Sequence, residues 1–326
     1  MYFLGIDPGG TKCEACLCDQ DGNILGYENW TKDCHPEIEE INNIEVDAGF
    51  GRSPKVIKNI INILLKKVPE NSEVHLGGCY APTFDEYKEH PQVNTTAEYI
   101  CEYSIPFYAE GIEKGFLALA GTGAICYYYD DNDNLSIDGL GPTLGDYGGG
   151  CYIGLQAIRK AARSEWSPQD YTSLGPRISQ ILLKRDTNHR GHDLIKFFFN
   201  MPNRSFVASF AKIVDEEAEK GDETAINILK EAAFALADTM RCVVYNAIDI
   251  EENLPIIGNG SVICKSRIYK EAFVEAAKKL LPGHEVITVS IPPCFGAVIF
   301  MGNKYANLDL KQFQQKIKKN FLELEK

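Results

Sequence analysis

Residues 4–12 read LGIDPGGTK, and this stretch predicts how the rest of the chain folds. The apolar residues 3–6 are typical of a buried strand, which ends at Asp7, Pro8 and two glycines. Glycine permits positive φ and lets backbone N–H groups approach an anion closely. A carboxylate such as Asp7 at the end of a core strand could hold Mg²⁺ through water, although alone it would more simply cap the turn. The stretch therefore predicts a strand followed by a tight turn that can hold a phosphate group.

Two other phosphate-binding motifs do not fit this sequence. A P-loop requires Lys-Ser or Lys-Thr after its second glycine and opens a helix, whereas here Thr11-Lys12 follows Gly10 and a hairpin is expected. No Gly-x-Gly-x-x-Gly follows a strand and opens a helix, so a dinucleotide-binding Rossmann domain is not expected either.

Working outward, the same pattern occurs a second time, about 115 residues further along the chain. Each copy has a strand, a glycine turn, a strand, a polar turn, a strand and a later helix. The first copy comprises strands 3–6, 13–18 and 24–27 with helix 53–68, and the second comprises strands 116–119, 125–129 and 135–137 with helix 151–165. An internal repeat of this kind predicts two similar α/β domains facing each other across a cleft.

The remaining sequence predicts mainly helices. Helices are expected at 207–220, 223–248 and 267–281, from 296 onward and in the amphipathic tail, with strands at 254–257 and 286–289. The strand at 254–257 runs into Gly258-Asn259-Gly260, a third glycine turn after an apolar strand.

Composition limits the possible partners and location. The 326 residues carry a net charge of −13, which is a poor match for nucleic acid or for an anionic membrane. No apolar run approaches the ~18–20 residues needed to cross a bilayer, and no signal peptide is recognised. The 11 cysteines are an odd number, scattered along the chain, which favours free thiols in a reducing cytoplasm.

Five stretches taken in order resemble a known family. They are LGIDPGGTK at 4–12, LAGTGA at 119–124, GPTLGDYGGG at 141–150, IIGNGS at 256–261 and PCFGA at 293–297. The set resembles the actin-like superfamily of sugar kinases, Hsp70 and actin, and more narrowly the N-acetylglucosamine kinase-like branch of the BadF/BadG/BcrA/BcrD ATPase family. The resemblance implies two ribonuclease-H-like α/β domains facing across a nucleotide cleft, formed by 1–115 plus 295–326 and by 116–294.

The resemblance also implies a kinase that uses ATP and Mg²⁺, with a sugar, most simply N-acetylglucosamine, as acceptor and with a homodimer possible. Asp7 would orient the metal, and Glu102 would take the proton from the sugar hydroxyl. The nucleotide would contact Gly9, Gly10, Thr11, Lys12, Gly121, Thr122, Gly123, Gly258, Asn259 and Gly260. Gly141 and Asp146 would contact the sugar, although Asp146 alone would suggest a helix N-cap.

The sequence departs from the family pattern mainly on the sugar side. Glu102 stands where the family has an aspartate on a helix, Leu140 replaces a tryptophan, and Tyr147 replaces a glutamate. These changes leave open a sugar or nucleotide sensor that has lost turnover. Another alternative is an ATPase activator of a 2-hydroxyacyl-CoA dehydratase or reductase, but residues 116–120 lack the cysteine that such activators use to bridge a cluster.

Overall fold

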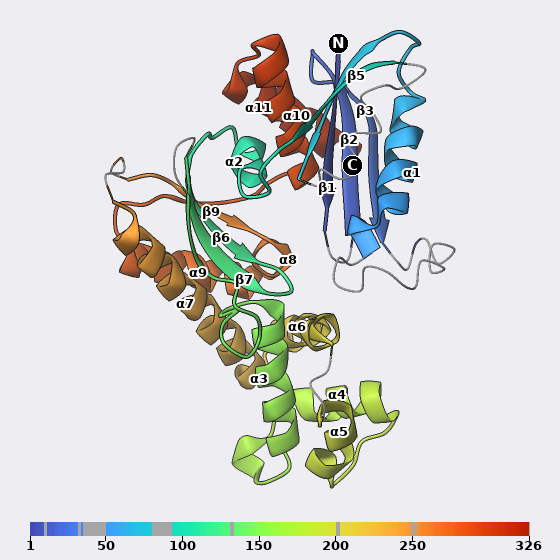
Figure 1. The fold of residues 1–326 in the computed structure, drawn as a ribbon. Coiled ribbons are helices and arrows are strands. Elements are labelled where there is room, and N and C mark those ends of the chain that lie inside the picture. Colours follow the sequence, from blue (N-terminus) through green and yellow to red (C-terminus); the bar gives the residue numbers. More distant parts are fainter. Residues whose placement is uncertain are drawn as a thin grey trace. The chain divides into compact units, whose positions relative to one another are not determined.

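The computed structural model describes residues 1–9, 12–31, 34, 50–79, 93–130, 134–199, 203–248, 251 and 253–325. The chain forms two compact units. Unit 1 comprises Met1–Lys114 and Val289–Lys326, and unit 2 comprises Gly115–Thr288. Unit 2 is therefore an insertion in the sequence of unit 1, and the blue and red ends of the chain belong to the same unit (Figure 1).

Unit 1 is built on a five-stranded sheet with the order β3-β2-β1-β4-β5. The first three strands, β1 (Tyr2–Pro8), β2 (Lys12–Asp19) and β3 (Ile24–Thr31), pair antiparallel. The others, β4 (Glu73–Gly78) and β5 (Asn94–Tyr99), run parallel to β1. Since β1, β4 and β5 point the same way, their carboxyl ends lie along one edge of the sheet.

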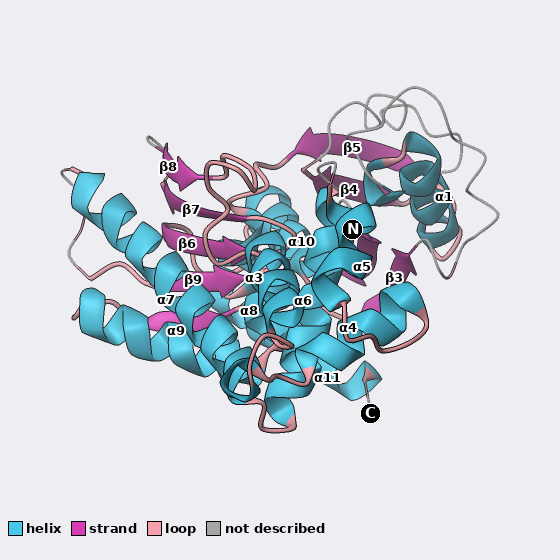
Figure 2. Ribbon diagram, turned by 90° about the horizontal axis from the view of Figure 1, so that it is seen from below, coloured by secondary structure: helices cyan, strands magenta, loops and turns pink. Residues whose placement is uncertain are grey.

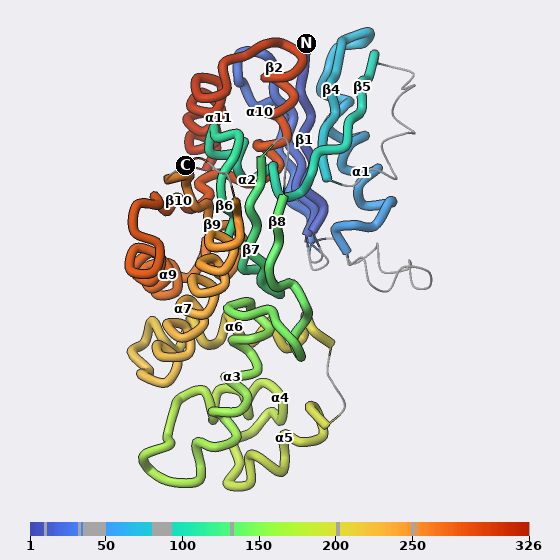
Figure 3. The backbone as a smooth tube through the Cα atoms, turned by 60° about the vertical axis from the view of Figure 1, so that its left-hand side comes forward, coloured from blue at the N-terminus to red at the C-terminus, as the bar shows by residue number. Residues whose placement is uncertain are grey.

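Alternating side chains on β1 and β2 give this sheet two apolar faces. One face, which includes Leu4 and Ala15, packs against α1 (Pro54–Leu65) beyond the short 3₁₀ turn Phe50–Arg52. The other face, which includes Phe3 and Cys16, is covered by α10 (Pro293–Ala306) and α11 (Leu310–Leu324), and α2 (Ile105–Ala109) joins the same layer. Figure 3 shows the red α10 and α11 beside the blue β1 and β2. A Cβ on Gly5 would lie 2.1 Å from the carbonyl oxygen of Cys294, so only glycine allows α10 to approach β1 this closely.

Unit 2 repeats this topology. Its sheet has the order β10-β9-β6-β7-β8, which corresponds strand for strand to β5-β4-β1-β2-β3 of unit 1. An antiparallel trio is formed by β6 (Gly115–Ala120), β7 (Ala124–Tyr129) and β8 (Asn134–Asp138), while β9 (Ile256–Asn259) and β10 (Val286–Thr288) run parallel to β6. Figure 2 shows β8, β7, β6 and β9 side by side in this order. The predicted α/β class and internal repeat are confirmed.

The core of unit 2 is formed by helices packed on and beyond this sheet. They are α3 (Gly150–Arg163), α4 (Leu174–Leu183), α5 (Arg190–Phe198), α6 (Arg204–Glu219), α7 (Glu223–Asn246), α8 (Ser261–Lys265) and α9 (Arg267–Leu280), with a 3₁₀ turn at Pro168–Asp170. Within the described part of the chain, no helix combines the length and the apolar character needed to cross a membrane.

Candidate functional site

Three side chains with chemical function follow the carboxyl ends of neighbouring strands in unit 1. Asp7 lies near the end of β1, Cys79 directly follows β4, and Glu102 comes three residues after β5. The Cys79 thiol donates a long hydrogen bond of 3.8 Å to Asp7 Oδ1. Ligands in α/β folds bind outside the carboxyl ends of parallel strands, so this edge is the candidate site of unit 1.

Asp7 lies opposite a second carboxylate. Its Cα is paired with that of Glu14 across the antiparallel strands β1 and β2. Burial, followed by the negative charges of Glu14 and Glu102, raises the pKa of Asp7 to about 6, against the opposing effect of Lys12. A cation bound at this carboxylate would relieve both effects.

Glu14 itself is buried and well satisfied. Its carboxylate accepts hydrogen bonds from Tyr27 Oη at 2.8 Å and Asn29 Nδ2 at 3.1 Å, and it forms an ion pair with Lys12 Nζ. These contacts fix the first residue of β2 at the end of the glycine turn. Glu14 was not predicted from the sequence, although a charged residue within an otherwise apolar strand was a usable signal.

The first glycine turn is tightly packed where the structure describes it. The Gly9 N–H donates to the Lys12 carbonyl at 2.8 Å, and a Cβ on Gly51 would lie 1.9 Å from the same oxygen. Gly10 and Thr11, which were predicted to contact phosphate, lie outside the described residues.

Glu102 lies in the turn before α2 and not on a helix, which corrects the expectation drawn from the family. Its carboxylate forms a 3.4 Å ion pair with Arg52, and both side chains are partly exposed. Arg52 Nε also donates to the Pro8 carbonyl at 3.3 Å. Arg52 therefore links the proposed base to the end of β1, a contact between distant segments that no local sequence pattern predicts.

In unit 2, the turn 121–123 connects β6 to β7 and accepts hydrogen bonds from the first residues of α3. Gly150 N–H donates to the Gly121 carbonyl at 2.8 Å, and Cys151 N–H donates to the Thr122 carbonyl at 2.9 Å. A Cβ on Gly149 would lie 2.5 Å from the carbonyl carbon of Gly123, whereas a Cβ on Gly121 would have no neighbour within 4 Å. The start of α3 therefore fixes one side of the turn, while the space beside Gly121 is free of neighbouring atoms of the described residues.

The third glycine turn lies beside the second. Asn259 at the end of β9 pairs with Leu119 of β6, and Gly258 lies within the same strand. Gly260 has φ +100°, and a Cβ there would lie 2.3 Å from the Ala120 carbonyl oxygen. The structure therefore brings two of the three predicted glycine turns together at the carboxyl ends of β6 and β9.

Asp146 is fully buried, with φ +59°, and its Oδ2 lies 2.6 Å from Arg204 Nη2 in an ion pair. The loop that carries it is held by Asp138, whose carboxylate accepts from the N–H groups of Asp146 at 2.6 Å and Tyr147 at 2.8 Å. Gly141 has φ +82° and open space where a Cβ would stand. Neither Asp138 nor Arg204 was recognised from the sequence.

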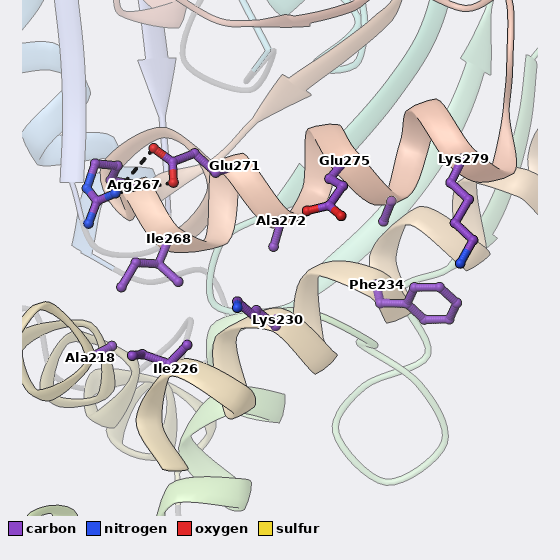
Figure 4. Close-up of a pocket in the computed structure, with 11 residues that line it drawn as sticks. Ala218, Ile226, Lys230, Phe234, Arg267, Ile268, Glu271, Ala272, Glu275 and Lys279 are labelled. Atoms are coloured by element: carbon purple, nitrogen blue, oxygen red, sulfur yellow. Dashed lines mark hydrogen bonds and ion pairs between the residues drawn. The ribbon is translucent and has the colours of Figure 1, made fainter. Parts of the chain in front are cut away.

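Among the described residues, no group of three or more His, Cys, Asp or Glu side chains is arranged to hold a metal ion. One hollow, of about 620 Å³, lies between α7 and α9 and is lined by residues that include Lys230, Phe234 and Glu271 (Figure 4). None of the predicted site residues lines this hollow, so it is separate from the glycine turns.

Comparisons with known proteins agree with this fold. A family model described as the BadF/BadG/BcrA/BcrD ATPase family matches residues 4–301. The chain is 26% identical to an N-acetyl-D-glucosamine kinase of Dictyostelium discoideum, over 92% of this chain and 98% of the relative. It is 25% identical to an N-acetylmuramic acid/N-acetylglucosamine kinase of Clostridium acetobutylicum, over 91% and 97%. A crystal structure of a Porphyromonas gingivalis protein provisionally named N-acetylglucosamine kinase has the same fold, with a TM-score of 0.65, 18% identity and coverage of 93% and 99%.

Proposed function

Because this chain belongs to the BadF/BadG/BcrA/BcrD ATPase family, we propose that it is an ATP-dependent hexosamine kinase whose preferred acceptor is N-acetylglucosamine. The observation that carries the proposal is the match of residues 4–301 to this family, together with Asp7 and Glu102 at one sheet edge. Relatives with kinase names over nine-tenths of the chain support the substrate class.

The nucleotide would be held by the glycine turns. The turn after β1, with Gly9 and Lys12, and the turn 121–123 would bind the phosphate chain through backbone N–H groups and charge. The stretch Gly258–Gly260 would contact adenosine, because it lies beside the turn 121–123 at the ends of neighbouring strands.

Asp7 fits a Mg²⁺ ion bound mainly by phosphate oxygens and water. Mg²⁺ in kinases is held by one or two carboxylates plus substrate phosphates, so the lack of a three-residue cluster among the described residues is compatible with it. The raised pKa of Asp7 also supports a bound cation, because a nearby positive charge would stabilise the ionised form of this buried carboxylate. When bound, the ion would neutralise charge on the transferred phosphate.

Glu102 would accept the proton of the attacking sugar hydroxyl. Its carboxylate is partly exposed and forms an ion pair with Arg52, so a substrate can reach it from solvent. A general base must come within about 2.6–3.2 Å of the proton donor. Arg52 would therefore have to share or release this carboxylate when the sugar binds.

A coupled ADP-release assay over hexoses, hexosamines and N-acetylhexosamines tests the proposal. We expect Mg·ATP-dependent turnover that is highest with an N-acetylhexosamine. Mg·ATP should also raise the melting temperature, because a ligand at 100 times its Kd stabilises the folded protein by about 2.7 kcal/mol. Nucleotide binding without transfer to any sugar would favour a nucleotide or sugar sensor, for which the Glu102–Arg52 ion pair is the supporting observation.

Two further features belong to the proposal. All 11 cysteines are free thiols, which suits a protein of the reducing cytoplasm. A homodimer, the commonest assembly for a chain of this kind, would be tested by light scattering of the purified protein.

A further inference from the structure

Arg204, the first residue of α6, lies directly against the turn 121–123. Its Nη2 is 2.6 Å from Asp146 Oδ2, and a Cβ added to Gly123 would lie 1.7 Å from the same nitrogen. The guanidinium therefore crosses the face of Gly123, and any larger residue at position 123 would displace it. This places a fixed positive charge on the surface of the proposed phosphate-binding turn.

The guanidinium has hydrogen-bonding capacity beyond its ion pair. Arginine carries five N–H donors in a planar fork, whereas Asp146 is its one acidic partner among the residues that the structure describes. The Arg204 side chain is 46% exposed, although the carboxylate beneath it is completely buried. Next to it, the space at Gly121 is open. An anion can therefore reach the guanidinium from solvent without breaking the contact to Asp146.

Asp146 is held in a way that suits a positioning residue. Its backbone N–H is bonded to Asp138, and its Oδ1 accepts from the Ala124 N–H at 3.4 Å. A buried carboxylate with these contacts fixes the direction of the arginine that pairs with it. The protein has a net charge of −13, so a polyphosphate needs such a local cation.

We propose that Arg204 binds the phosphate chain of the nucleotide at the turn 121–123, and that Asp146 positions Arg204 for this contact. The inference rests on the proposed function. It gives Asp146 a role on the nucleotide side beside the sugar contact expected from the family resemblance.

The test measures Mg·ATP and Mg·ADP affinity by calorimetry without sugar, and then the KM for ATP and for the best sugar. We expect Arg204→Met to weaken nucleotide binding by about 10- to 100-fold and Arg204→Lys to weaken it less, because a point charge remains but the fork is lost. Arg241→Met is the matched control, since Arg241 is 45% exposed and pairs with Asp238 at 2.8 Å in the same unit. We expect this control to bind nucleotide like the wild type.

Asp146→Asn should weaken nucleotide binding in the same direction by a smaller factor, because the amide positions the guanidinium less firmly. Added to Arg204→Met, it should cause little further loss, because both act on one contact. Circular dichroism and thermal melting check that each variant is folded. If Arg204→Met does not fold, Arg204→Lys and Asp146→Asn take its place in the measurement of nucleotide affinity.

Unchanged nucleotide affinity in folded Arg204→Met would overturn the inference. So would unchanged nucleotide affinity in folded Asp146→Asn. If the wild type binds nucleotide through Arg204 but phosphorylates no sugar, the proposed function fails and the inference stands. If the wild type binds no nucleotide, both fail.

Discussion

At the scale of single residues, the structure separates carboxylates that look alike in the sequence. Glu14 is buried but satisfied by three partners, Asp7 is opposed by a like charge, and Glu102 is exposed enough to meet a substrate. Each environment predicts a different response to neutralisation of the charge.

Glu102→Gln should reduce turnover by at least ~10²-fold while leaving Mg·ATP affinity nearly unchanged, because the amide cannot accept the hydroxyl proton and the phosphates are held elsewhere. Steady-state kinetics and calorimetry measure the two effects. Glu70→Gln, at an exposed turn of the same unit, is the control. Wild-type turnover in Glu102→Gln would remove this residue from the mechanism.

Neutralising Asp7 should have opposite effects on activity and stability. Asp7→Asn removes a buried charge and its repulsion with Glu14, so we expect the free energy of unfolding without metal to rise by about 1–2 kcal/mol while turnover is lost. Glu14→Gln should lower stability, because it disturbs the contacts of a buried group with Lys12, Tyr27 and Asn29. Chemical denaturation in EDTA compares the two variants, and a loss of stability in Asp7→Asn would contradict the like-charge argument.

Residues with an obvious chemical role could be predicted from the sequence, but their partners could not. Asp7 and the glycine turns follow apolar strands, which is a local pattern. Arg52 and Arg204 reach Glu102 and Asp146 from segments about 50 and 60 residues away, and only the folded chain brings them together.

At the scale of elements, most strands and helices with strong periodicity were predicted, whereas the helices α4 and α5 and several short or polar elements were missed. The edge strand β5 has the sequence NTTAEY and mostly exposed or half-buried side chains, so no apolar alternation marks it. The strand β4 ends in two glycines, and α2 and α8 have only five residues each. Pairing with β1 or packing against larger helices stabilises these elements, and such long-range contacts leave no local signal.

The N-terminus of α7 is fixed by four hydrogen bonds to one carboxylate, that of Asp222. Asp222 caps it by accepting from the Ala225 N–H at 2.8 Å, and its other oxygen accepts from Thr172 Oγ1 at 2.9 Å and from the Ser173 N–H at 2.7 Å and Oγ at 2.9 Å. One carboxylate therefore joins α7 to the segment before α4.

Asp222→Ala should cost about 1–3 kcal/mol of unfolding free energy at neutral pH. Although partial burial opposes the shift, hydrogen bonds from the Ala225 and Ser173 N–H groups lower the pKa of Asp222. Its contribution is therefore complete above the unfolded pKa, near 4, and is lost as the pH falls through the lower folded value. Denaturant titrations should show the difference from wild type constant between pH 5 and 8 and shrinking below pH 4.

Asp309→Ala provides the comparison for this prediction. Asp309 caps α11 through a single bond from the Gln312 N–H at 2.8 Å, so its removal should cost less. Equal losses in the two variants would mean that the contacts of Asp222 to residues 172 and 173 contribute nothing.

At the scale of the whole molecule, each unit has its own apolar core. The cores on the two faces of the first sheet belong to unit 1, and the large helical core belongs to unit 2. The two segments of unit 1 meet where Glu110 Oε1 accepts from Ser290 Oγ at 2.7 Å. A short linker can therefore replace the whole of unit 2.

We expect Met1–Lys114 joined by a short flexible linker to Val289–Lys326 to fold in one cooperative transition, measured by thermal and urea denaturation. Met1–Lys114 alone should not fold, because it lacks α10 and α11 and leaves Phe3 and Cys16 uncovered. A joined protein without a cooperative transition would show that unit 1 depends on unit 2.

The insertion of unit 2 within unit 1 also dictates an order of events at the ribosome. The β1–β2 hairpin is synthesised first, but α10, which covers one of its apolar faces, leaves the exit tunnel only after all of unit 2. At ~5–20 residues per second this delay is on the order of 15–60 s, during which a nascent apolar sheet surface is exposed. Unit 2 can complete its fold during elongation, whereas unit 1 must wait until α10 and α11 have been synthesised. The nascent protein is therefore expected to need a chaperone for its N-terminal sheet.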